Sequence, residues 1–112
     1  MNSTAARKFP ELTDFVGAVE RAYGPRLHAV HLFGSRARGN ARRDSDYDVA
    51  VVLKEIGDFW VEKMRLADLA YDQMLARDIH VQAHPFALDE WQAENREDFV
   101  LAAQRVAMEL AP

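Results

Sequence analysis

The sequence of 112 residues contains no cysteine and no long hydrophobic run. Without cysteine, disulfides and thiolate metal sites are excluded, and a reducing cytoplasm is compatible with the composition. No run approaches the roughly 18 apolar residues of a membrane span. The N-terminal segment MNSTAARKFPEL also lacks the apolar centre of a signal peptide. We therefore expect a cytoplasmic protein that does not associate with membranes.

An excess of positive charge is also missing. The formal net charge is -4, and non-specific affinity for nucleic acid grows with cationic charge, so we expect no stable binding to nucleic acid. The sequence shows no linker, repeat or low-complexity tract. With 49% hydrophobic residues, residues 1–112 have the material for one compact domain and no room for a second.

Hydrophobic periodicity predicts an α/β (α+β) fold, with a small mixed sheet and flanking helices in the order α-β-β-α-β-α. Helices are indicated by apolar residues at steps of three and four, and strands by short apolar runs between turn residues. The expected elements are a helix over 10–23, strands over 27–33 and 46–53, a helix over 58–77, a strand over 79–86, and a last helix marked by Phe99, Ala103, Val106 and Leu110.

The long helix over 58–77 has one apolar face, formed by Trp60, Met64, Ala67, Tyr71 and Met74. Such a face usually packs into the core, and we expect this of Trp60, Met64 and Tyr71. A platform for stacking a nucleobase is the alternative interpretation. Near the end of the chain, Trp91 and Phe99 fit either a partner surface or a second core cluster.

Asp46 and Asp48 begin the second predicted strand. In a strand, residues i and i+2 project from the same face about 7 Å apart, whereas in a helix they point roughly 200° apart. The strand therefore lets the two carboxylates converge, and their repulsion is relieved by a hard cation such as Mg²⁺, which also binds substrate phosphates. The alternative is a solvated acidic turn that includes Asp44.

A Gly-Ser pair, Gly34 and Ser35, ends the first strand ten residues before this motif. Glycine permits a sharp turn and a close approach to phosphate, and the serine hydroxyl can bind a phosphate oxygen or cap a following helix. Arg36 and Arg38 follow, and guanidinium groups bind phosphate in a bidentate manner. The same function is less strongly indicated for Arg42 and Arg43. The alternative for all four arginines is pairing with nearby acids, including Asp44 and the carboxylates of the last helix.

The stretch GSRARGNARRDSDYDVAVVL, residues 34–53, resembles the core of the minimal nucleotidyltransferase (MNT) family of the DNA polymerase β superfamily. The resemblance implies a polymerase β-like fold and transfer of a nucleoside monophosphate from ATP with Mg²⁺. It makes Asp46 and Asp48 the catalytic, metal-binding residues. It makes Gly34, Ser35, Arg36 and Arg38 the nucleotide-binding residues.

The resemblance also implies a partner. Small members of the family are commonly encoded beside a HEPN protein, often a ribonuclease toxin, and act as its antitoxin within a hetero-oligomer. Some add AMP to a tyrosine of that partner. The first alternative is a binding module that neutralises the partner by stoichiometric contact, and the second is transfer to a small molecule or an RNA end.

The family usually has a third carboxylate on a later strand, and the matching segment here reads DIHVQAHPF. Three possibilities remain open from the sequence. Asp78 serves as the third acid, His80 serves as a general base, or the group is lost and activity is weak. His80 and His84 also fit ordinary polar residues on an exposed strand face.

Overall fold

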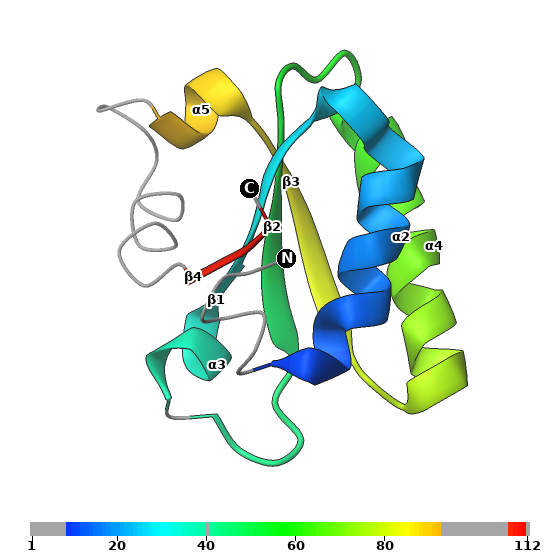
Figure 1. Cartoon of the computed structure of the whole chain (residues 1–112), viewed down its shortest axis with the longest axis vertical. Coiled ribbons are helices and arrows are strands. Elements are labelled where there is room, and N and C mark those ends of the chain that lie inside the picture. Colours follow the sequence, from blue (N-terminus) through cyan, green and yellow to red (C-terminus); the bar gives the residue numbers. More distant parts are fainter. Residues whose placement is uncertain (1–8, 40, 93–107, 112) are drawn as a thin grey trace.

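The structure, a computed structural model, describes residues 9–39, 41–92 and 108–111 (Figure 1). Its elements in chain order are η1 (Pro10–Leu12), α2 (Thr13–Tyr23), η2 (Gly24–Arg26), β1 (Leu27–Phe33), α3 (Gly34–Arg38), β2 (Tyr47–Leu53), α4 (Phe59–Arg77), β3 (Val81–Ala87), α5 (Leu88–Gln92) and β4 (Met108–Ala111). The elements η1 and η2 are 3₁₀ helices. Within these residues, no helix is both long and apolar enough to span a membrane.

The four strands form one mixed sheet in the order β3-β2-β1-β4. Strand β1 is antiparallel to both β2 and β4, and β2 is parallel to β3. The parallel pair is connected by α4, because parallel neighbours need a crossover. The predicted small mixed sheet with flanking helices is therefore confirmed. The register aligns Asp48 with Phe33 of β1 and with Gln82 of β3.

Both faces of β2 are buried, which explains its continuous apolar sequence. On one face, α2 and α4 cover the sheet (Figure 1). The core on that side includes Phe15, Val49, Val51, Leu53 and Leu66. The other face has a smaller cluster next to α5, formed by Ala29, Phe33, Ala50, Val52, Phe86 and Trp91. Of the two interpretations of Trp91, the second core cluster is therefore the one that the structure supports.

The predicted last helix is wrong at its end. Leu110 lies in β4, where it is buried at 1% exposure and pairing with β1 satisfies the strand backbone. A step of four residues does not by itself separate a helix from a short strand. Phe99, Ala103 and Val106 lie outside the described residues. The short helices α3 and α5, of five residues each, are too short for periodicity to reveal.

The predicted core face of α4 is also wrong. Trp60, Met64 and Tyr71 are 71%, 62% and 48% exposed, and the helix instead buries Glu62, Leu66 and Gln73. These buried residues lie roughly 140° around an ideal helix from the apolar face. Glu62 is tolerated there because Tyr23, Arg26 and Arg65 all contact its carboxylate. Periodicity identified the helix and its apolar face but not the face that packs.

Candidate active site

The two acids of the Asp-x-Asp motif lie together at the start of β2. Asp46 directly precedes the strand and Asp48 is its second residue, so both side chains project from one face. Burial raises the pKa of Asp48 above its ordinary value, the charge of Asp46 raises it further, and the charge of Arg38 opposes both effects. The acids therefore repel each other, and a cation held between them would relieve this repulsion.

Gly34 brings the end of β1 against Asp48. It turns the chain with a φ of 75°, directly after the residue that pairs with Asp48. A Cβ at Gly34 would lie 3.1 Å from Cγ of Asp48 and closer still to its Oδ2. Both the positive φ and this close approach require glycine. Ser35 follows in α3, where it does not act as the cap, because the helix has no side-chain capping bond.

Arg36 is bound to its own loop. Its Nη2 donates to the backbone oxygen of Ser45 at 2.8 Å and to that of Arg43 at 3.2 Å. Its guanidinium also lies 4.3 Å from the ring centroid of Tyr47. These contacts hold the loop against α3 and so set the point from which Asp46 enters β2. Contact between Arg36 and a phosphate stays a prediction.

The other arginines of this stretch are exposed. Arg38 is in α3 and is close enough to Asp48 to affect its pKa. Arg42 and Arg43 are exposed, and neither forms a salt bridge with an acid in the part of the chain that the structure describes. The pairing with Asp44 that the sequence allowed is therefore not present.

Two residues of β3 that the sequence interpretation missed lie beside the acids. Nε2 of Gln82 is 3.5 Å from Oδ2 of Asp46, and Nε2 of His84 is 3.8 Å from Oδ1 of Asp48. Burial, with a smaller contribution from the charge of Lys63, lowers the pKa of His84 to about 4. Parallel pairing of the second and third predicted strands would have found Gln82, because the register aligns it with Asp48, whereas His84 is aligned with Ala50.

Of the two residues considered for the missing acid, Asp78 lies at the end of α4, and His80 lines the same groove as Asp46. Asp78 is the C-cap of α4 in the left-handed region, with a φ of 55° and a side chain that is 95% exposed. The ring of His80 lies 3.4 Å from the Asp78 carboxylate, and its backbone oxygen accepts from the backbone N–H of Tyr47. Over residues 9–39, 41–92 and 108–111, no group of three potential metal ligands is present.

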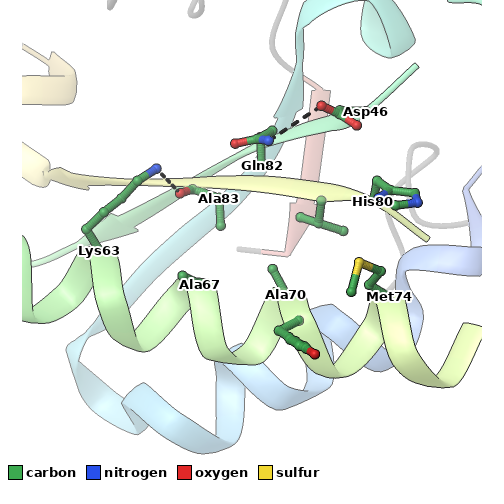
Figure 2. A pocket seen from close by; sticks show the side chains of 10 residues that line it. Asp46, Lys63, Ala67, Ala70, Met74, His80, Gln82 and Ala83 are labelled. Atoms are coloured by element: carbon green, nitrogen blue, oxygen red, sulfur yellow. Dashed lines mark hydrogen bonds between the residues drawn. The ribbon is translucent and has the colours of Figure 1, made fainter. Parts of the chain in front are cut away.

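A groove of about 420 Å³ runs between β3 and α4, with Asp46 among its lining residues (Figure 2). Its polar lining is Asp46, Lys63, His80 and Gln82, and its remaining lining is Ala67, Ala70, Tyr71, Met74, Val81 and Ala83. Nζ of Lys63 donates to the backbone oxygen of Ala83 at 2.7 Å. Of the two acids, Asp46 therefore borders this largely apolar groove, and Asp48 is not among its lining residues.

Residues 21–93 match the model of the family described as "Polymerase beta, Nucleotidyltransferase". The chain belongs to this nucleotidyltransferase family. The match includes the Gly-Ser pair, the acid pair and all of β3, so the residues described above lie within the family domain. No curated protein matches the chain.

Solved structures with a similar fold include several toxin–antitoxin complexes. One was crystallised with AMP-PNP; it is 23% identical with a TM-score of 0.57, and the alignment covers 86% of this nucleotidyltransferase and 69% of that chain. Another contains a tri-AMPylated Shewanella oneidensis HEPN toxin with its MNT antitoxin, at 19% identity, a TM-score of 0.51, and coverage of 89% and 71%.

A nucleotidyltransferase-like protein from Sulfolobus solfataricus is similar as well. It is 22% identical with a TM-score of 0.51, and the alignment covers 94% of this chain and 78% of that one. The polymerase β-like fold expected from the sequence is thus confirmed.

Proposed function

We propose that this protein transfers AMP from ATP to a HEPN toxin and thereby acts as its antitoxin in the cytoplasm. The observation that carries the proposal is the contact of Gly34 with Asp48, beside Asp46 on one strand face. This close approach supports a site in which the Gly34 turn would hold a phosphate next to the two carboxylates. The family membership supports the reaction type, and the similar toxin–antitoxin complexes support the partner.

The donor set of the acid pair fits Mg²⁺. The ion prefers oxygen ligands and commonly takes one or two carboxylates, with substrate phosphates and water completing its shell. Asp46 and Asp48 supply two carboxylates, and Gly34 lets the end of β1 lie directly against one of them. When bound, Mg²⁺ would neutralise negative charge on the phosphates. Arg38 is exposed and close enough for its charge to lower the pKa of Asp48, and its guanidinium would bind the leaving pyrophosphate.

The reaction consumes a hydroxyl group of the acceptor. Its oxygen forms a bond to the α-phosphorus of ATP, the bond from that phosphorus to the bridging oxygen breaks, and pyrophosphate leaves. The hydroxyl proton is released to water. Gly34 and Ser35 would hold the triphosphate, and Arg36 would keep the loop that carries Asp46 in position through Ser45. We assign no proton transfer to His84.

The test uses labelled ATP, Mg²⁺ and the product of the neighbouring gene. We expect the wild-type protein to label that product, and the double variant Asp46→Asn, Asp48→Asn to reduce labelling to background. The matched control is Asp44→Asn, because Asp44 is an exposed acid of the same loop to which we assign no role. Wild-type labelling by the double variant would contradict the roles of the acid pair.

A second function is favoured by one observation. The described residues place no third carboxylate with Asp46 and Asp48, which suits a protein that neutralises its partner by stoichiometric contact alone. The same double variant distinguishes the two functions in cells that express the toxin. If the variant protects these cells as well as the wild type does, neutralisation does not depend on nucleotidyl transfer.

A further inference from the structure

The outer face of α4 carries a stripe of exposed residues at alternating steps of three and four. The helix packs its other side over the sheet (Figure 1), and the stripe runs along the side that faces solvent. Its five positions are Val61, Met64, Asp68, Tyr71 and Leu75, and the four apolar ones are between 48% and 69% exposed. An apolar stripe with this spacing is typical of a helix that pairs with another helix.

A hollow of about 540 Å³ lies over the first half of this stripe. In helix pairing, a side chain of one helix inserts between four residues of the other, at positions i, i+3, i+4 and i+7. The hollow is lined by such a set of four, Val61, Met64, Arg65 and Asp68. Leu75 is the exposed aliphatic residue at the other end of the stripe. The stripe therefore contains both a side chain that can insert and a hollow that can receive it.

We propose that α4 pairs in an antiparallel manner with α4 of a second copy of this chain, across a two-fold axis. Leu75 of each copy enters the hollow of the other copy and lies opposite Met64. Every contact then occurs twice, as in an isologous dimer. The ring of Tyr71 and the side chain of Val61 continue the apolar seam on either side of this contact.

The charges beside the stripe fit this register. Arg65 directly follows Met64 and Asp72 directly follows Tyr71, so both lie on the same edge of the stripe, and both are exposed. With Met64 opposite Leu75, Asp72 of one copy is about 3 Å along the axis from Arg65 of the other. Arg65 contacts Glu62 through Nη1, and its guanidinium has further donors. The dimer thus gains two pairs of opposite charge, which set its orientation.

The position of Asp68 disfavours a parallel pair. Equal positions share a layer in a parallel pair, so the two Asp68 carboxylates would face each other within the seam and repel. Reversing one helix instead puts each Asp68 in a layer with Tyr71 of the other copy. A single polar residue in a seam lowers its stability but specifies its register.

Other occupants fit the face less well. Helices that lie on lipid surfaces carry Lys and Arg beside their apolar face, whereas Asp68 and Asp72 lie within and beside this one. A different protein would require no match between one half of the stripe and the other. Here Leu75 matches the hollow and Asp72 matches Arg65 within one sequence, which favours a second copy.

Cysteine variants test the register directly, because the chain has no cysteine of its own. Met64→Cys protein is mixed with Leu75→Cys protein and oxidised. We expect a disulfide between the two variants and none within either variant alone, because equal positions are roughly 16 Å apart along the axis. The matched control is Ala76→Cys with Met64→Cys, since Ala76 is exposed next to Leu75 but off the stripe. A disulfide within Met64→Cys alone would overturn the antiparallel pair.

Sedimentation equilibrium tests the association itself. We expect the wild-type chain to dimerise with a dissociation constant between roughly 1 µM and 1 mM. Leu75→Asp should raise this constant tenfold or more, because it puts an unpaired charge into each hollow. Ala76→Asp is the matched control, because it adds the same charge one residue away, and its constant should stay within about twofold of the wild type.

Two results of this measurement would overturn the proposal. A wild-type monomer throughout this range would assign the face to a different protein. A wild-type dimer that Leu75→Asp leaves intact would place the contact on another surface. Neither result concerns nucleotidyl transfer, because the stripe substitutions at Met64 and Leu75 are not at the acid pair or the Gly34 turn.

Discussion

At the scale of single residues, Gly34 meets two requirements of the site that only glycine satisfies. It combines a positive φ with an approach to Asp48 that leaves no space for a Cβ. Gly39 has a similar φ of 80°, but a Cβ there would meet nothing within 4 Å. A comparison of alanine variants at the two glycines therefore distinguishes two effects. Backbone strain is common to both positions, whereas displacement of Asp48 is expected at Gly34 alone.

We predict that Gly34→Ala weakens MgATP binding by roughly tenfold or more, because the new methyl group displaces Asp48. Gly39→Ala should keep its affinity near the wild-type value. Both variants should lose about 1 kcal/mol of unfolding free energy, since each places alanine at a positive φ. Calorimetric titration with MgATP and urea unfolding measure these effects. Equal affinities for the two variants would show that Gly34 acts through strain alone.

Much of the site could be predicted at this scale. The spacing of Gly34, Asp46 and Asp48 is local and depends on strand geometry that the sequence indicates. The contacts of Arg36 could not be predicted, because its partners are backbone oxygens of the loop, Ser45 and Arg43. No sequence feature of an arginine in a basic stretch distinguishes a contact with its own loop from a contact with a phosphate.

At the scale of elements, both ends of α4 are defined by aspartates. Asp58 is the N-cap and accepts from the backbone N–H groups of Trp60 and Val61. Asp78 is the C-cap, and its backbone N–H donates to the oxygen of Met74 at 3.0 Å. Capping of α4 therefore explains the position of Asp78 without any contact to a metal.

We predict that Asp78→Gly raises the unfolding free energy by up to about 1 kcal/mol, because glycine adopts the left-handed C-cap without strain. The exposed contact between Asp78 and His80 contributes little to stability, so its loss in the variant does not offset this gain. AMP transfer should stay within twofold of the wild type. Urea unfolding and the labelling reaction measure the two effects. Loss of transfer in a stable variant would restore Asp78 as the missing third acid.

The helices and strands differ in how well the sequence predicted them. The strand over 27–33 was predicted with the observed bounds, and the helix over 58–77 with the observed end, because their apolar patterns are bounded by turn residues. The last predicted helix was wrong at Leu110. Strand β4 is stabilised by its pairing with β1, and the pairing of distant segments cannot be recognised from a short stretch of sequence.

At the scale of the whole molecule, Tyr23 and Glu62 connect α2 to α4. The Tyr23 hydroxyl donates to Oε1 of Glu62 at 3.3 Å, and Arg26 pairs with the same carboxylate. Burial raises the pKa of Tyr23 to about 12, and the nearby charge of Glu62 adds to this effect. Ionisation of Tyr23 is therefore unfavourable only in the folded protein, so it affects global stability.

The sign of the pH effect follows from this. Because the pKa of Tyr23 is higher in the folded state, its contribution to the unfolding free energy is fully present below the unfolded pKa of 10.0. This contribution is lost as the pH rises toward 12. We predict that Tyr23 accounts for a loss of about 1.4 kcal/mol in unfolding free energy at pH 11 relative to pH 8. Tyr23→Phe should be less stable by about 1 kcal/mol at pH 8, with the difference vanishing near pH 11.

Urea unfolding at both pH values measures this difference. Tyr71→Phe is the matched control, because Tyr71 is a half-exposed tyrosine of α4, the helix that carries Glu62, and the stability of this variant should follow the wild type at both values. Parallel pH dependence of Tyr23→Phe and the wild type would contradict the role of the Tyr23 hydroxyl.

The sequence by itself determined the two longer helices, the strands up to β3, and the spacing of the acid pair and the glycine beside it, because each depends on contacts or spacing within a short segment. Only the tertiary structure decided which face of α4 packs, and that the side chains of Gln82 and His84 contact the acids. These outcomes depend on sheet register and on compensation of a buried charge by distant residues, and both are properties of the assembled chain.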